Sequence, residues 1–165
     1  DKTVEFSLVL PVSRSRVVTA KALAALINCA LFVLVTWGIS LLAVQQYNPD
    51  QAFYDFLCQE MWAMFFIELI FLAVGLLRGC GMRRYKVAGS TAVAIILATY
   101  FMSILSTMQE KLNFLKYFTP FRYFDAAEFY HSGQFESGYM ILSAGIVLAC
   151  VAAAYWIYNR RDLYI

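Results

Sequence analysis

Few side chains in this sequence are placed to do chemistry, and Glu68 is the most prominent of them. It lies in the run Phe65-Phe-Ile-Glu-Leu-Ile-Phe71, near the middle of an apolar segment. A carboxyl group at the centre of a membrane helix costs on the order of 3 kcal/mol to insert, so it usually faces a cavity or a partner. Two interpretations stay open. Glu68 is either a protonated acid hydrogen-bonded between helices, with Thr36 and Thr99 at similar depth, or a polar site for substrate or protons.

The other reactive residue types fit no catalytic or metal-binding motif. The sequence contains no Gly-x-x-x-x-Gly-Lys-(Ser/Thr), His-Glu-x-x-His or Gly-x-Ser-x-Gly, the patterns of P-loop, zinc-protease and serine-hydrolase sites. Four cysteines are scattered without a Cys-x-x-Cys pair, and the single histidine, His131, precedes Ser132-Gly133 as in a loop. We therefore expect no catalytic residue, no metal and no cofactor bound by this chain.

The composition indicates that these residues are positioned by membrane-spanning helices. Of 165 residues, 62% are hydrophobic and 15% charged, with mean hydropathy +0.65, which is too apolar for an ordinary soluble domain. A net charge of +2 gives no reason to expect nucleic-acid binding. Four segments can cross about 30 Å of hydrocarbon as helices: residues 22–44, 58–77, 87–108 and 139–158. Within them, Gly75, Gly89 and Gly145 are either close helix contacts or tolerated passengers.

The predicted fold is thus all-α, a polytopic membrane protein with four transmembrane helices, and its basic residues orient it. Four spans place the N-terminus, the 78–86 connection and the C-terminus on one face, which carries ten of the thirteen Lys and Arg residues. The 109–138 connection on the other face carries three. By the positive-inside rule, the sequence predicts a multi-pass protein of the cell membrane with both ends of this chain in the cytoplasm.

The first twelve residues form a segment too short to span. Phe6, Val9 and Leu10 share one helical face, and Pro11 ends any helix just before it. Ser13 or Ser15 can then cap the helix that follows. A short amphipathic helix on the cytoplasmic surface is predicted, either as an interfacial anchor or as a docking element.

Three stretches of sequence resemble one family. Residues 2–21, Lys-Thr-Val-Glu-Phe-Ser-Leu-Val-Leu-Pro-Val-Ser-Arg-Ser-Arg-Val-Val-Thr-Ala-Lys, resemble the cytoplasmic segment before the third helix of ABC-2 type transporter permeases. Residues 115–125, Leu-Lys-Tyr-Phe-Thr-Pro-Phe-Arg-Tyr-Phe-Asp, are similar to the segment these permeases carry outside between their fifth and sixth helices. Arg160-Arg-Asp-Leu163 resembles their cytoplasmic ending. The resemblance covers essentially the whole chain and implies the C-terminal part of a six-helix permease whose first two helices precede Asp1.

The resemblance also implies a function. The chain would be the transmembrane permease subunit of an ABC exporter, coupling ATP hydrolysis by a separate subunit to substrate movement. Its partners would be an ABC ATP-binding subunit, which holds ATP and Mg²⁺, and a second permease copy or a paralogue. The first segment would be the coupling segment, and the implied docking residues are Glu5, Phe6, Leu8, Pro11, Arg14 and Arg16. No residue selects among peptides, lipids, drugs, polysaccharides and ions as cargo.

The 109–138 connection is extracytoplasmic in this topology and rich in aromatic residues. Eight of them fall between Phe114 and Tyr130, a density typical of an aromatic belt at the membrane edge. Alternatively, residues 111–130 form short helices that dip into the outer leaflet and cap an exit, with Pro120 dividing the element and Arg122 paired to Asp125 or Glu128. The candidate outer-gate residues are Tyr117, Phe118, Pro120, Phe121, Arg122 and Asp125.

Two functions of other classes stay open. A polytopic membrane enzyme using Glu68 or His131 would be active without ATP or a partner. A non-transporting anchor or assembly factor would bind a different cytoplasmic protein through its first segment. Co-purification of a Walker-type ATPase favours the transporter over both.

Overall fold

The described chain is built from helices. The computed structural model describes residues 13–81, 85–108, 114, 118–124 and 137–160, and no strand occurs among them. The elements in chain order are α2 (Arg14–Val44), the 3₁₀ helix η1 (Gln45–Tyr47), α3 (Gln51–Gly81), α4 (Tyr85–Met108), α5 (Pro120–Tyr123) and α7 (Ser137–Arg160). Four helices are long and apolar enough to cross a membrane. The predicted all-α polytopic fold is confirmed, and each predicted span lies within one of α2, α3, α4 and α7.

The helices run further than the apolar segments alone suggest. α2 begins at Arg14, directly after Ser13, so a helix that starts at the predicted serine carries Arg16 and Lys21 into the first apolar segment. Ser13 occupies the N-cap in extended conformation, and its carbonyl oxygen accepts the Arg16 amide at 3.0 Å. Within the described residues its side chain makes no capping bond, so the predicted serine cap is correct in position only.

The turn between α2 and α3 is tight. Asn48 adopts φ 45°, in the left-handed region that asparagine tolerates, and Pro49 cannot extend the preceding helix. Asp50 Oδ1 then accepts the Phe53 amide at 3.2 Å, which caps the start of α3. As a result α2 and α3 form an antiparallel hairpin with three residues between η1 and α3.

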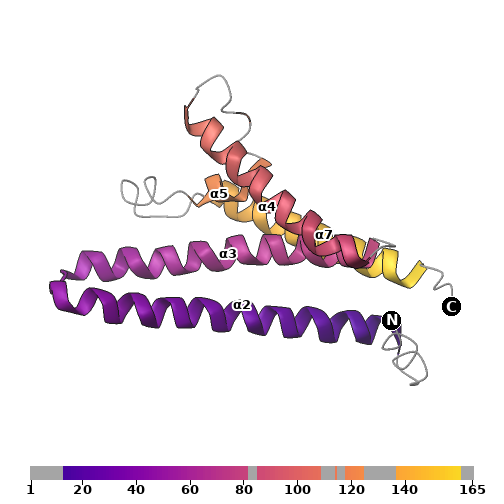
Figure 1. The fold of residues 1–165 in the computed structure, drawn as a ribbon, viewed down its shortest axis with the longest axis horizontal. Coiled ribbons are helices and arrows are strands. Elements are labelled where there is room, and N and C mark those ends of the chain that lie inside the picture. The colour runs from indigo at the N-terminus through magenta and orange to yellow at the C-terminus, as the bar shows by residue number, and fades with distance from the viewer. Residues whose placement is uncertain (1–12, 82–84, 109–113, 115–117, 125–136, 161–165) are drawn as a thin grey trace.

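α3 is the central helix of the bundle (Figure 1). It contacts α2, α4, α5 and α7, whereas the described contacts of α4 are with α3 and α5. α4 leans away from the other long helices toward Met108 (Figure 1). The start of α2 and the end of α7 lie together at one end of the bundle, which we call the basic end because it carries Arg16 and Arg160. The opposite end, at η1, is the turn end.

Two apolar clusters hold the helices together. The first, near the basic end, joins Val18 of α2, Cys80 of α3 and Ala154 of α7. The second lies deeper and joins Ala63 and Ile70 of α3 to α5, with partly buried side chains of α7 packed against it. Because α3 and α7 both pass from the second cluster to the first, they run in the same direction.

The close helix contacts are made by alanines rather than by glycines. Ala73 and Ala154 are fully buried at 0% exposure, so the backbones approach each other there. A Cβ added at Gly75, Gly89 or Gly145 would meet no atom of the described chain within 4 Å, apart from its own helix backbone. The described chain therefore gives no support to close helix contacts at these three glycines.

Candidate functional site

The residues implied to dock an ATP-binding subunit lie at the basic end or before it. Glu5, Phe6, Leu8 and Pro11 fall outside the described residues. Arg14 is the first residue of α2, and Arg16 is exposed in its first turn. Residues 1–12, the predicted coupling segment, directly precede Ser13 in the sequence and therefore connect to the α2–α3 hairpin.

The first turns of α2 are fixed to the end of α7. The hydroxyl oxygens of Thr19 and Tyr155 lie 2.7 Å apart. The Thr19 hydroxyl donates to the Ser15 carbonyl oxygen at 2.9 Å, so its single proton is used and Tyr155 must donate to Thr19. Val18, the neighbour of Thr19, is 3% exposed within the cluster that contains Ala154. The start of α2 is therefore in contact with both α7 and α3.

At the other candidate site, α5 begins at Pro120. Proline suits the first helical position because its missing N–H would have no partner there. Thr119 precedes it in extended conformation at 0% exposure, and its carbonyl oxygen accepts the Arg122 amide at 3.0 Å. Pro120 therefore starts a helical turn here, where the sequence analysis expected it to divide a helix.

Aromatic rings fasten α5 into the space between α3, α4 and α7. Phe121 lies against Phe71 of α3, with ring centroids 5.3 Å apart, and edge-on to Tyr100 of α4 at 5.7 Å. Phe124 stacks on Phe66 of α3 at 5.6 Å, and Tyr123 stacks on Tyr139 of α7 at 5.2 Å. Such pairs stabilise a contact by about 0.5–1.5 kcal/mol beyond the area they bury. α5 thus acts as a wedge that contacts three spanning helices at once.

These contacts decide between the two interpretations of the aromatic connection for part of its length. Tyr123 and Phe124 are 3% and 5% exposed, so they pack inside the bundle and do not form a lipid-facing belt. Burial, and secondly the neighbouring Tyr139, raise the pKa of Tyr123, which keeps its phenol neutral. Phe114 and Phe118 are exposed, as belt residues would be.

The remaining candidate gate residues are placed only in part. Arg122 is half-buried on α5. Tyr117 and Asp125 lie outside the described residues, as does Glu128. The predicted pairing of Arg122 with one of these acids therefore stays a prediction.

Glu68 is half-buried on α3, and its hydrogen-bond partner is the thiol of Cys29 on α2. Its Oε2 atom is enclosed and has no hydrogen-bond partner in the described part of the chain. Thr99 instead donates within its own helix, 2.9 Å from the carbonyl oxygens of Ile95 and Ile96. Thr36 lies seven residues from Cys29, about 10 Å along α2. The structure therefore joins Glu68 to Cys29 and not to the two threonines.

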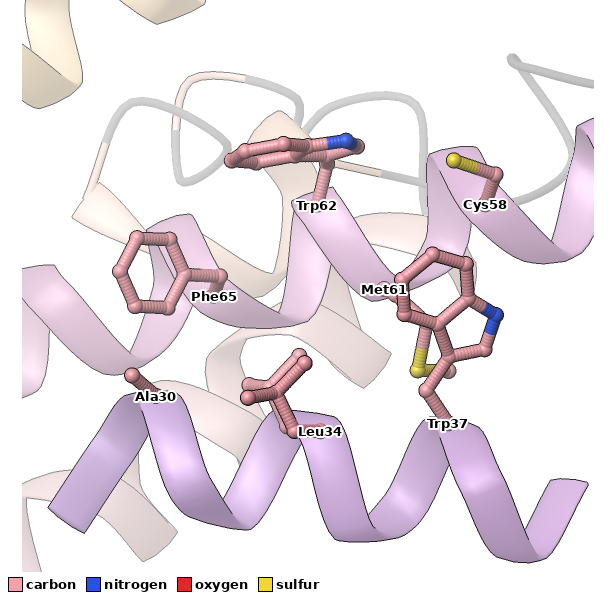
Figure 2. A pocket seen from close by; sticks show the side chains of 8 residues that line it. Ala30, Leu34, Trp37, Cys58, Met61, Trp62 and Phe65 are labelled. Atoms are coloured by element: carbon pink, nitrogen blue, oxygen red, sulfur yellow. The ribbon is translucent and has the colours of Figure 1, made fainter. Parts of the chain in front are cut away.

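An apolar groove of about 260 Å³ lies between α2 and α3 (Figure 2). Its lining residues on α3 precede Glu68, so it lies on the turn-end side of that residue. Ala30, Leu34 and Trp37 of α2 line it from one side, and α3 contributes Met61 and Phe65 (Figure 2). Hydrocarbon fits such a lining, in which the indole groups of Trp37 and Trp62 and the thiol of Cys58 are the polar groups. Sequence reasoning missed this groove because its residues are ordinary membrane-helix residues.

The described residues contain no group of three or more His, Cys, Asp and Glu side chains that could hold a metal ion. The intramembrane pair of Glu68 and Cys29 brings together only two such side chains within the described residues. The arrangement consists of a hydrogen-bonded contact between α2 and α7 at the basic end and of ring contacts around α5 deeper in the bundle.

Comparison with known proteins identifies the family. The sequence profile of the ABC-2 family transporter protein matches residues 1–163. No curated protein and no solved structure matches the chain significantly. With four helices able to span a membrane and a family match over almost its whole length, the chain belongs to the ABC-2 family of transporter proteins and is a multi-pass membrane component of a transport system.

Proposed function

We propose that the chain belongs to the permease subunit of an ABC exporter. A separate ATP-binding subunit would bind ATP and Mg²⁺ and hydrolyse the nucleotide. The permease would convert the resulting closure into substrate movement across the cell membrane. Family membership supports this role, and nucleotide handling by a partner agrees with the lack of a P-loop in these 165 residues.

The junction of α2 with α7 is the observation that carries the proposal. Force applied to residues 1–12 would enter α2 at Ser13. The Thr19–Tyr155 hydrogen bond and the buried Val18 would pass it to α7 and α3, because packed helices shift as units and resist gradual deformation. α4, which contacts only α3 and α5 among the described elements, is the helix against which the others would move. The ring contacts of α5 would then break and re-form as an outer gate.

The distribution of basic residues supports the proposed orientation. Arg14, Arg16, Lys21, Arg78 and Arg160 all lie on helix turns toward the basic end, whereas Arg122 is on α5. The positive-inside rule places the basic end in the cytoplasm. α2 and α4 also carry many exposed apolar side chains, which suit lipid and the proposed second permease copy or paralogue.

Purification of the transporter in mild detergent tests this function. We expect a Walker-type ATPase to co-purify and its ATP hydrolysis to be recovered with the permease. Phe6→Ala should reduce the recovered ATPase at least about tenfold, as expected for an apolar anchor at an interface. Phe118→Ala, at an exposed position beside α5, is the matched control and should leave recovery unchanged.

The alternatives give different outcomes in the same experiment. Substrate turnover by the permease without ATP or a partner would indicate a membrane enzyme. Reproducible recovery of a cytoplasmic protein other than an ATPase, lost in Phe6→Ala, would indicate an anchor or assembly factor. Either result contradicts the proposal.

A further inference from the structure

A narrow crevice between α3 and α4 encloses part of an arginine side chain. Its volume is about 20 Å³, and Arg78 is the charged residue in its lining, which otherwise consists of Gly75, Ala92 and larger apolar residues of both helices. The Nε atom of Arg78 is buried and has no hydrogen-bond partner in the part of the chain that the structure describes. A charged donor enclosed without an acceptor is costly, so the site invites an acceptor from elsewhere.

The neighbouring sequence offers Arg78 no carboxylate. No Asp or Glu occurs between Glu68 and Glu110, a stretch that includes the second half of α3, all of α4 and four basic residues. The described residues of α2 and α7 near this end add further positive charge, at Arg16 and Arg160. Among the described residues near this end there is thus no carboxylate for Arg78, and an external anion suits the surplus of positive charge.

The depth of Arg78 matches a lipid headgroup. It lies in the last turn of α3, three residues before the helix ends at Gly81. A helix of 31 residues is about 46 Å long, and the hydrocarbon core is about 30 Å thick, so the last turn of α3 falls in the headgroup region. The Nε–H and the adjacent Nη–H of a guanidinium are parallel donors that match two oxygens of a phosphate.

Below the guanidinium, the crevice is apolar and open. Gly75 lies about one helical turn deeper than Arg78, and a Cβ added there would meet no described atom within 4 Å, its own helix backbone aside. Ala92 of α4 also has a small side chain. The enclosed space of about 20 Å³ holds about one water molecule, so a longer ligand would lie along the crevice and cover it from outside. The guanidinium thus lies at the end of a narrow apolar surface formed by both helices.

We propose that this crevice binds one anionic phospholipid from the leaflet at the basic end. Its phosphate contacts the Arg78 guanidinium, and one acyl chain lies over Gly75 and Ala92. Surplus positive charge at this end favours an anionic lipid over a zwitterionic one. The bound lipid bridges α3 and α4, and its binding does not depend on the proposed ATP coupling.

Native mass spectrometry of the purified transporter, titrated with phosphatidylglycerol or phosphatidylcholine, measures this binding directly. Arg78→Gln removes the two donors, and Gly75→Leu fills the crevice without changing the charge. Arg160→Gln is the matched control, because it removes one positive charge at the same end from a guanidinium that lies 4.5 Å over the Trp156 ring.

At about 0.5 M salt, where exposed charges are screened, Arg78→Gln should weaken phosphatidylglycerol binding at least about tenfold. Gly75→Leu should weaken it comparably, Arg160→Gln should bind as the parent protein does, and phosphatidylcholine should bind the parent more weakly. Equal binding by Arg78→Gln and Arg160→Gln would overturn the proposal. So would unchanged binding by Gly75→Leu, or displacement of the lipid by millimolar inorganic phosphate, which would assign Arg78 to a free anion.

Discussion

Glu68 and Cys29 form a polar contact in the interior of the α2–α3 hairpin. The sequence predicts a polar partner for this carboxyl group, but the partner is Cys29 and not Thr36 or Thr99. The hairpin register explains the difference. Cys29 precedes Asn48 by 19 residues and Glu68 follows Pro49 by 19, so an antiparallel hairpin folded at Asn48-Pro49 brings them to the same level. The equal spacings of Cys29 and Glu68 from Asn48-Pro49 are present in the sequence. They predict the contact only once the turn is known to be three residues long.

A double-mutant cycle measures what the pair contributes. Cys29→Ala and Glu68→Gln should each lower the thermal stability of the purified protein, and the double variant should lose less than the sum of the two. Hydrogen bonds between membrane helices contribute about 0.6 kcal/mol on average and up to about 1.7, and the coupling energy should fall in this range. Coupling indistinguishable from zero would contradict the hydrogen bond.

Transport assays separate the structural role of Glu68 from a functional one. If Glu68 serves only the contact with Cys29, then Glu68→Gln should transport at the parent rate with an unchanged pH dependence. A lost or shifted pH dependence in Glu68→Gln, without the same change in Cys29→Ala, would instead show that the carboxyl group binds protons or substrate.

At the scale of elements, the hydrogen bond between α2 and α7 gives the next prediction. Tyr155→Phe removes the donor to Thr19 and should lower the free energy of unfolding by about 0.6 kcal/mol. If the junction passes force, the variant should also transport less substrate for each ATP hydrolysed. Tyr158→Phe, one turn further along α7 in the same apolar cluster, is the control and should behave like the parent. An equal defect in both variants would mean that the cluster is disturbed in general and that the hydrogen bond has no special role.

The wedge formed by α5 gives a third prediction. Phe121→Ala removes the ring that touches both Phe71 and Tyr100, so water should enter between α3 and α4 more easily. In a cysteine-free background, we expect Tyr100→Cys to react with a water-soluble maleimide faster when Phe121→Ala is present. Phe118→Ala, whose ring is 69% exposed, should leave the rate unchanged. Equal labelling in all three proteins would argue against α5 as a gate.

The spanning helices could be predicted from the sequence because a long apolar run between polar connections is typical of a membrane-spanning helix. The start of α2 could be predicted too, from the serines before Arg16 and Lys21. The end of α3 could not, since the helix continues through Arg78 to Gly81, where hydropathy is low but nothing breaks it. The placement of α5 was also out of reach. Its contacts join residues 121–124 to rings at 66, 71, 100 and 139, and such long-range pairing leaves no local pattern.

At the scale of the whole molecule, the described helices fall into two parts. α2, α3 and α7 share the apolar cluster at the basic end, whereas α4 contacts the rest through α3 and α5. The sequence indicated the family and the basic end, but the division between these parts depends on which helices touch. Under the proposed function, a push on residues 1–12 moves the first three helices together against α4.

The most direct measurement is site-directed crosslinking of the intact transporter during ATP turnover, with the four native cysteines replaced by alanine. Phe6→Cys should crosslink to the ATP-binding subunit, and the crosslink yield should change when hydrolysis is arrested. Gln46→Cys, exposed at the turn end, should form no such crosslink and should react with impermeant reagents from outside the cell. A transporter that hydrolyses ATP and moves substrate while Phe6→Cys contacts no ATP-binding subunit, or is labelled from outside, would contradict the account.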